Sequence, residues 1–282
     1  MNELEPVLTV ELFPAERQEL LKLLSQLSAE EWALPTVCAG WCVKDLALHV
    51  LGDDVGVLSR KRDGHSSQTQ SVDSWAELVA FLNEWNEQWV AATRRLSPRL
   101  LIDLLKLTGD ELYHYFKSID PDALGDPDAL GGPVSWAGPE PAPVWLDIAR
   151  EYTERWLHQQ QIRDAVKRPG LRDRRFLGPV LETFVRALPH TYRGVEAAAD
   201  THVKLIVGGE AGGEWSLVRR DRGWVLGRGE ERTPSATVRL DQNIAWRLFT
   251  KGLSEEQAHE AVRIEGDAAL GAKMLKAVAI IA

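Results

Sequence analysis

Residues 39–50 of the chain read AGWCVKDLALHV and place a histidine inside an apolar, helix-forming stretch. Apolar residues after the loop recur at three- and four-residue intervals, which predicts an amphipathic helix over 41–60. His49 lies in this helix, with Asp45 and Asp53 four positions to either side of it. At about 3.6 residues per turn these side chains share one face. The stretch therefore predicts a helix that presents an imidazole beside carboxylates.

Residues 154–165, ERWLHQQQIRDA, repeat this combination on a second expected helix, over 145–166. Glu154 and His158 stand four positions apart, so a carboxylate oxygen and an imidazole nitrogen can reach one ion from the same helix face. If the two helices face each other, His49 supplies a third ligand, as happens in the cores of helical bundles. The same spacing also occurs in ordinary solvated contacts along helices, so spacing alone leaves a structural interpretation open.

Two imidazoles and one carboxylate would leave coordination positions for water or substrate, which is typical of a catalytic rather than a structural metal. We expect zinc as the bound metal, with nickel, iron and manganese as alternatives. Such ligands bind all of these ions, so the relative affinities and the supply of each ion determine which one occupies the site.

The rest of the first two thirds is also helical in pattern. The segment 120–143 is rich in Gly, Pro and Asp and is expected to be a long connection, often a functional cover in compact domains. Residues 28–31, SAEE, indicate a capping box that opens a short turn. The tryptophans are expected to fill the core of the bundle, namely Trp75, Trp85, Trp89, Trp145 and Trp156. Further helices are expected over 11–27, 74–96, 100–118 and 176–192.

The period changes after about residue 200. Strands are expected over 203–207, 214–220, 224–228 and 236–240, and helices over 241–250, 254–259 and 267–281. The fold class is therefore multidomain, α then α+β. We expect a helical domain over 1–170, a linking helix over 171–200, and a smaller α+β domain over 201–282.

Bulk composition excludes several classes of protein. The 282 residues carry a net charge of −9, and no basic stretch is longer than residues 60–62, so nucleic acid is not an expected partner. Residues 1–10 carry no basic run of the kind that begins a signal peptide, and no apolar run approaches the ~18 residues of a membrane span. The two cysteines, Cys38 and Cys42, make no disulfide framework. We expect a cytoplasmic protein, monomeric or homodimeric, with no membrane partner.

The two quoted segments together resemble the DinB-like superfamily, whose first signature reads GWxVxDLxxH, and more narrowly the mycothiol-dependent maleylpyruvate isomerase family. Residues 208–282, with IEGD at 264–267, resemble the sterol-carrier-protein-like domain at that family's C-terminus. The resemblance implies a DinB-like four-helix bundle whose metal is held by His49, Glu154 and His158.

Two positions depart from the family pattern. Gln161 stands where the family usually has Asp three residues after the metal-binding His, and Lys251 lies nearest to a position where some members carry Arg. Lys does not replace Arg as an anchor for a carboxylate. Asp45 and Gln161 are the candidates to orient the metal ligands, and Asp45 could equally serve the first turn of its helix. Arg247 and Lys251 are the candidate contacts to thiol or substrate.

The resemblance also implies a reaction. A low-molecular-weight thiol similar to mycothiol would bind the metal as a thiolate and add to a small electrophile, for S-transfer or cis–trans isomerisation. Two other functions remain open: a metal-dependent hydrolase at the same site, and a non-enzymatic carrier of a small ligand with a structural metal. Cys38 and Cys42 are candidates to extend the site, since Cys42 lies seven residues before His49 and so near the same helix face, although such cysteines are more often packing groups.

Overall fold

The computed structural model describes residues 1–65, 74–126, 128–138 and 141–280. Within these residues the chain forms two compact units. The helical unit comprises Thr9–Pro121 and Glu151–Leu171, and the sheet unit comprises Met1–Leu8, Asp122–Arg150 and the described chain from Arg172 on. The expected order of a helical N-terminal region followed by a sheet-rich C-terminal region is confirmed. The division into domains at 1–170, 171–200 and 201–282 stays a prediction. The two compact units are not consecutive along the chain, since each is made of separate segments.

The helices of the helical unit begin where capping residues allow. Ser28, Ser74 and Ser97 each accept a hydrogen bond from a backbone N–H three residues on, and the capping box that begins at Ser28 is present. Pro98 is the first residue of a helix, where proline is tolerated because a backbone N–H at this position would have no partner within the helix. The helices are α1 (Phe13–Ser25), α2 (Ala29–Trp32), α3 (Val43–Val57), α4 (Trp75–Thr93), α5 (Pro98–Lys117) and, from Glu151 on, α7 (Val144–Ala165). Residues 66–73, which precede Ser74, lie outside the described chain.

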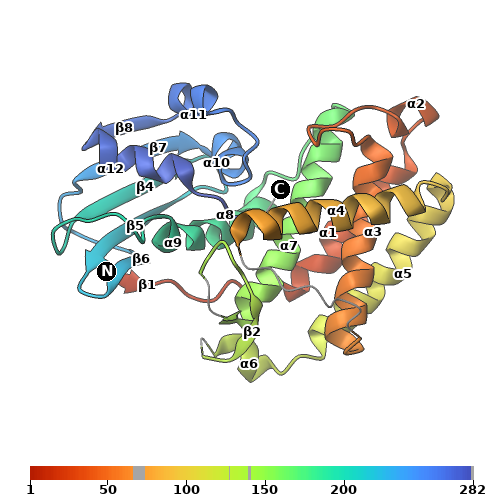
Figure 1. The fold of residues 1–282 in the computed structure, drawn as a ribbon, viewed down its shortest axis with the longest axis horizontal. Coiled ribbons are helices and arrows are strands. Elements are labelled where there is room, and N and C mark those ends of the chain that lie inside the picture. The colour runs from red at the N-terminus through yellow and green to blue at the C-terminus, as the bar shows by residue number, and fades with distance from the viewer. Residues whose placement is uncertain (66–73, 127, 139–140, 281–282) are drawn as a thin grey trace. The chain divides into compact units, whose positions relative to one another are not determined.

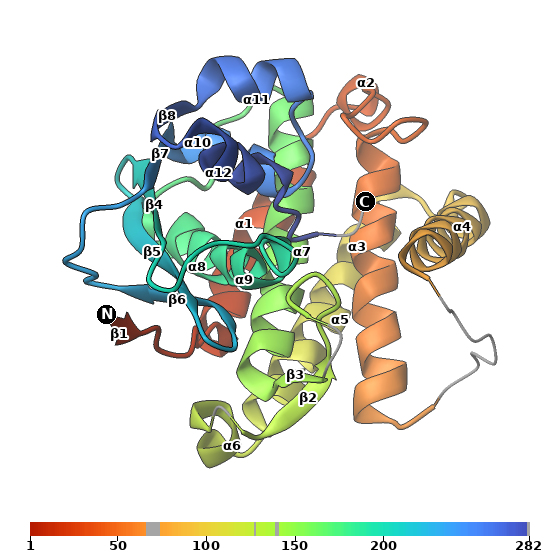
Figure 2. The same ribbon diagram turned by 60° about the vertical axis from the view of Figure 1, so that its left-hand side comes forward.

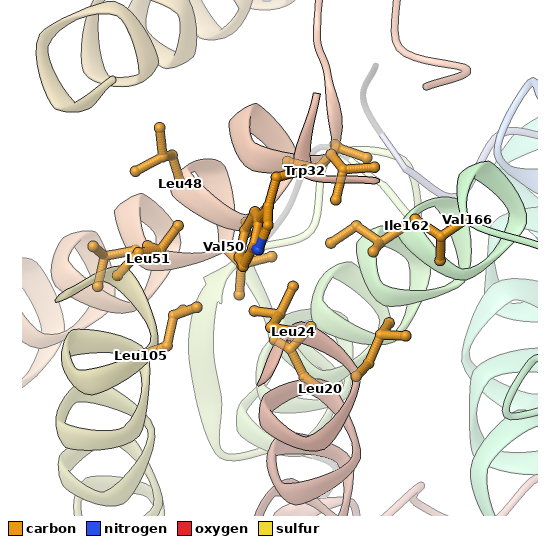
Figure 3. Packing of buried hydrophobic residues seen from close by; sticks show 14 of the residues in the cluster. Leu20, Leu24, Trp32, Leu48, Val50, Leu51, Leu105, Ile162 and Val166 are labelled. Carbon is orange, nitrogen blue, oxygen red and sulfur yellow. The ribbon is translucent and has the colours of Figure 1, made fainter. Parts of the chain in front are cut away.

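The core of the helical unit is formed by apolar side chains from all these helices (Figure 3). Burying one large aliphatic side chain contributes about 1.5–3 kcal/mol, so this cluster is the main reason that the helices stay together. α4 packs against α3 (Figure 2). The members labelled in Figure 3 are Leu20 and Leu24 of α1, Trp32 of α2, Leu48, Val50 and Leu51 of α3, Leu105 of α5, Ile162 of α7, and Val166 just after α7.

The prediction that the tryptophans fill the bundle core is wrong for three of them, Trp75, Trp85 and Trp145. Trp75 and Trp85 are each 43% exposed, because α4 buries only Val90 among its described residues. Trp156 is fully buried in the helical unit, whereas Trp145, also buried, belongs to the sheet unit.

The sheet unit is built on six strands in the order β1-β6-β5-β4-β7-β8 (Figure 1). β4 runs parallel to β7, and the other neighbours are antiparallel. Leu205 of β4 stands opposite Trp215 of β5 and Val238 of β7. The strands are β1 (Asn2–Glu3), β4 (His202–Gly208), β5 (Gly213–Arg220), β6 (Gly223–Arg228), β7 (Ala236–Asp241) and β8 (Arg263–Gly266).

Helices of the same unit pack on this sheet, with α9 against β6, α10 against β4 and β7, and α12 against β7 and β8. The helices of this unit after α7 are α8 (Arg174–Phe184), α9 (Leu188–Thr191), α10 (Gln242–Phe249), α11 (Glu255–Ala261) and α12 (Ala268–Ala272), and α8 and α11 pack against α10. The helix expected over 267–281 is shorter than predicted: α12 passes into a 3-10 turn, Lys273–Lys276, and the last expected residue lies outside the described chain.

The segment 120–143 is not a plain connection. It contains α6 (Pro121–Gly125) and a two-stranded hairpin of β2 (Leu130–Pro133) and β3 (Pro141–Pro143). In the part of the chain that the structure describes, no helix combines the length and apolar character that crossing a bilayer would need.

Candidate metal centre

The two histidines predicted from the sequence face each other across α3 and α7. The Nε2 atoms of His49 and His158 lie 3.1 Å apart, and the rings are nearly perpendicular at 84°. Both residues are only 7% exposed. Two ring nitrogens at this distance, one from each helix, form the centre of the site.

A carboxylate adjoins each histidine one helical turn away. Asp53 Oδ2 lies 3.5 Å from His49 Nε2, and Glu154 Oε2 lies 3.7 Å from His158 Nε2. The ligand atoms of His49, Asp53 and His158 all lie within 4.8 Å of one another. Asp53 was identified in the sequence only as a neighbour of His49, although its four-residue spacing is the same signal that singled out Glu154.

The distances among the ligand atoms of His49, Asp53 and His158 suit one divalent ion, whereas Glu154, expected as a ligand, lies near His158 but outside the group whose ligand atoms are all within 4.8 Å of one another. In a tetrahedral zinc site the ligand atoms lie about 2.0–2.2 Å from the metal and hence roughly 3.3–3.6 Å from one another. The contacts of 3.1, 3.5 and 3.7 Å depart from that range by a few tenths of an ångström at most. The donor set of imidazole nitrogen and carboxylate oxygen therefore fits zinc or a related first-row metal.

The protonation state of His158 also suits a ligand. Burial, together with the charge of His49, lowers the pKa of His158 from 6.5 to about 3, although the hydrogen bond that His158 donates to Gln161 opposes this shift. The imidazole is therefore neutral at pH 7, the form that binds a metal. Burial raises the pKa of Asp53, and the charge of His49 opposes that rise.

Gln161 orients the ring of His158. Its Oε1 lies 2.8 Å from His158 Nδ1 and accepts the N–H there, which leaves the Nε2 lone pair directed at the site. The Cys38 thiol donates to the same oxygen at 3.6 Å, and burial raises the pKa of that thiol. Cys38 thus touches the residue that orients a histidine, which its position in the sequence did not reveal.

Asp45, the other candidate to orient a ligand, is engaged at the start of α3. It accepts the Cys42 backbone N–H at 3.1 Å and the Arg94 Nε at 2.9 Å. Burial of Asp45 would raise its pKa, but these hydrogen bonds hold the pKa below its usual value. Of the two uses considered for Asp45, these contacts are those of a first-turn carboxylate.

Arg247 and Lys251 belong to the sheet unit. The Arg247 guanidinium lies 4.2 Å from the centre of the Trp246 ring and donates to the Asn243 carbonyl at 3.0 Å. Lys251 adopts a positive φ of 55° in the turn after α10. Their contact with a thiol or substrate stays a prediction.

The comparison with known families bears directly on this site. The family model described as the mycothiol maleylpyruvate isomerase N-terminal domain matches residues 13–163, more than half of the chain. The chain belongs to this family. The matched region includes the first quoted segment, the second up to residue 163, and all four side chains of the centre, His49, Asp53, Glu154 and His158.

Solved structures show the same fold. A crystal structure of a mycothiol-dependent maleylpyruvate isomerase, and one of a histidine-to-alanine variant of it, each match with a TM-score of 0.51 and 13% identity, over 91% of both chains. No curated protein matches the sequence. The family and its solved structures are thus those of thiol-dependent isomerases, as the sequence resemblance predicted.

Proposed function

We propose that this protein is a divalent-metal-dependent isomerase that uses mycothiol or a closely similar thiol as cosubstrate. The proposed substrate is a small electrophile with a cis double bond, with maleylpyruvate the first to test. Membership of the family supports the thiol and the reaction class. The observation that carries the metal is the pair of buried imidazoles 3.1 Å apart with a carboxylate one turn from each.

The residues proposed to hold the ion are His49 and His158, with a carboxylate from Glu154, Asp53 or both. When bound, the ion lowers the pKa of a coordinating thiol and so supplies a thiolate nucleophile. Gln161 keeps one ring nitrogen of His158 protonated and the other available. The Trp41 ring, 5.2 Å from the His49 ring, adds an apolar wall that limits water beside the site.

For the isomerisation itself, the thiolate sulfur would add to one carbon of the double bond. Rotation about the resulting single bond and loss of the same thiolate would give the trans product. Thiol and proton are both returned, so no oxidant or reductant is consumed. Retention of the sulfur instead would give S-transfer.

The test begins with metal content. Purified protein should hold about one ion per chain by plasma emission, and His158→Ala should lose it while its helical circular dichroism stays unchanged. His114→Ala, at an exposed histidine on α5, is the matched control and should keep the metal. Full metal in His158→Ala would defeat the assignment.

The thiol is tested separately. Isothermal titration of the metal-loaded protein with mycothiol should release heat, and maleylpyruvate should be isomerised only when mycothiol is present. Turnover without any thiol, or no heat with mycothiol, bacillithiol or glutathione, would contradict the proposed reaction.

A further inference from the structure

A second polar cluster lies in the core of the helical unit, and it is centred on Asp54 of α3. This carboxylate is fully buried, and it binds a side chain from each of three other helices. The Arg17 guanidinium of α1 lies 2.7 Å from Oδ2, Thr108 Oγ1 of α5 donates to Oδ2 at 2.7 Å, and Arg155 Nε of α7 donates to Oδ1 at 2.9 Å. One carboxylate thus joins α1, α3, α5 and α7.

Arg155 is held as firmly as Asp54. Its guanidinium is fully buried, and Nη1 donates to the carbonyl and the carboxylate of Glu151, at 2.8 and 3.0 Å. The other Glu151 oxygen meets Lys61 at 3.3 Å. Although burial opposes it, the charges of Arg17 and Arg155 hold the pKa of Asp54 low. Asp54 and Arg155 are therefore a charged pair that must stay together, since an unpaired buried charge is strongly unfavourable.

The pair lies next to the metal centre on both helices. Asp54 follows Asp53 on α3, and Arg155 follows Glu154 on α7. One residue along a helix is only about 1.5 Å of rise and about 100° of rotation. A bond between Asp54 and Arg155 therefore sets the relative height and rotation of the two helix segments that carry the donor atoms.

We propose that Asp54 and Arg155 are a positioning pair, which fixes α3 against α7 so that the Nε2 atoms of His49 and His158 stand at ion-binding separation. The inference rests on the proposed metal centre. Metal sites need their donors held within roughly 0.5 Å, and a slip of a single residue between the helices would be about 1.5 Å. Apolar packing alone tolerates small slips, because it lacks the directionality of hydrogen bonds.

Arg17 provides a natural control for this proposal. It is a buried arginine on the same carboxylate, at the same kind of distance. It comes from α1, and none of the four donors of the centre lies on that helix. Loss of Arg17 therefore removes a comparable ion pair from the core without removing the direct link between α3 and α7.

The experiment compares Arg155→Met and Arg155→Lys with Arg17→Met and Arg17→Lys in the full chain. Co²⁺ replaces the native metal, and its dissociation constant and visible absorption spectrum are measured beside the melting temperature. We expect both arginine positions to lower the melting temperature. Only the Arg155 variants should weaken Co²⁺ binding, by about 10–100-fold, and alter the band shape that reports coordination geometry. Lys keeps the charge but loses the planar array of donors, so Arg155→Lys covers the case in which Arg155→Met does not fold.

Two results would overturn the positioning role. One is Co²⁺ affinity and spectra in the Arg155 variants equal to those of the unsubstituted protein. The other is an equal loss of affinity in Arg17 and Arg155 variants of matched stability. The underlying metal proposal fails differently: the unsubstituted protein would then bind no stoichiometric Co²⁺, or would bind it as well after His158→Ala.

Discussion

Replacing Gln161 by Leu should weaken metal binding, because the Leu side chain cannot accept the Nδ1–H of His158. In the metal-free protein the imidazole can move its proton to Nε2, but when Nε2 is a ligand the proton must stay on Nδ1. His158 is 7% exposed, so water cannot readily replace the 2.8 Å bond that is lost. A buried donor without a partner costs about 1–3 kcal/mol, and that cost falls on the metal-bound state alone. The expected loss of affinity is about 10–100-fold.

The affinity is measured by competition with a chromophoric zinc chelator at neutral pH. Gln161→Glu is the matched variant: it keeps an acceptor at the same length and adds a negative charge, so it should bind zinc at least as tightly as Gln. Affinity of Gln161→Leu within twofold of the unsubstituted protein would refute the reasoning. So would an equal loss in both variants, since charge and acceptor would then be irrelevant.

Two further predictions concern stability. The pKa of His158 is about 3 in the folded protein and 6.5 in the unfolded chain. Between these two pH values the unfolded chain therefore binds more protons than the folded protein. The free energy of unfolding of the metal-free protein should be greatest above pH 6.5 and fall as the pH is lowered, by at most about 1.4 kcal/mol per pH unit. Urea unfolding above and below pH 6.5 measures this fall, which His158→Gln should reduce; an unchanged slope in the variant would rule out this histidine as its cause. Gly52→Ala should destabilise by about 1–3 kcal/mol, since the added Cβ would lie 2.7 Å from atoms of the Trp89 ring. The tryptophan emission should shift as that ring moves away from the Leu48 carbonyl it now binds. Unchanged stability and emission would mean that α4 can move to accommodate the added methyl group without loss of stability, and would contradict the prediction.

The sequence predicted the helices of the candidate site well because the signals are local. Apolar spacing located α3 and α7, and the four-residue step placed Glu154 and His158 on one face. The facing of His49 and His158 needed the family resemblance, since spacing within one helix carries no information about its neighbour. The same limit explains Asp53: it has the spacing of Glu154, and only the rotation of α3 against α7 shows how near it lies to both histidines.

Other features depend on tertiary packing that no short pattern records. β1 contains two residues, and it is a strand only because β6 lies beside it. Asp54 and Arg155 are charged residues that average hydropathy would place at the surface, yet both are fully buried because each satisfies the other. Trp85 is apolar and was expected in the core of the bundle, but it lies on α4, which buries only Val90 among its described residues. Cytoplasmic location and oligomeric state stay predictions.

The interleaving of the two compact units has a practical consequence for dissecting the protein. The chain passes from one unit to the other between residues 8 and 9, 121 and 122, 150 and 151, and 171 and 172. A fragment cut at residue 170 would keep every donor of the candidate centre, yet it would carry β1 without β6, the strand that completes it. The remaining fragment would lack an edge of its own sheet. Expression of separate halves is therefore the wrong strategy for this molecule, and point substitutions in the intact chain are the way to separate the contributions of its parts.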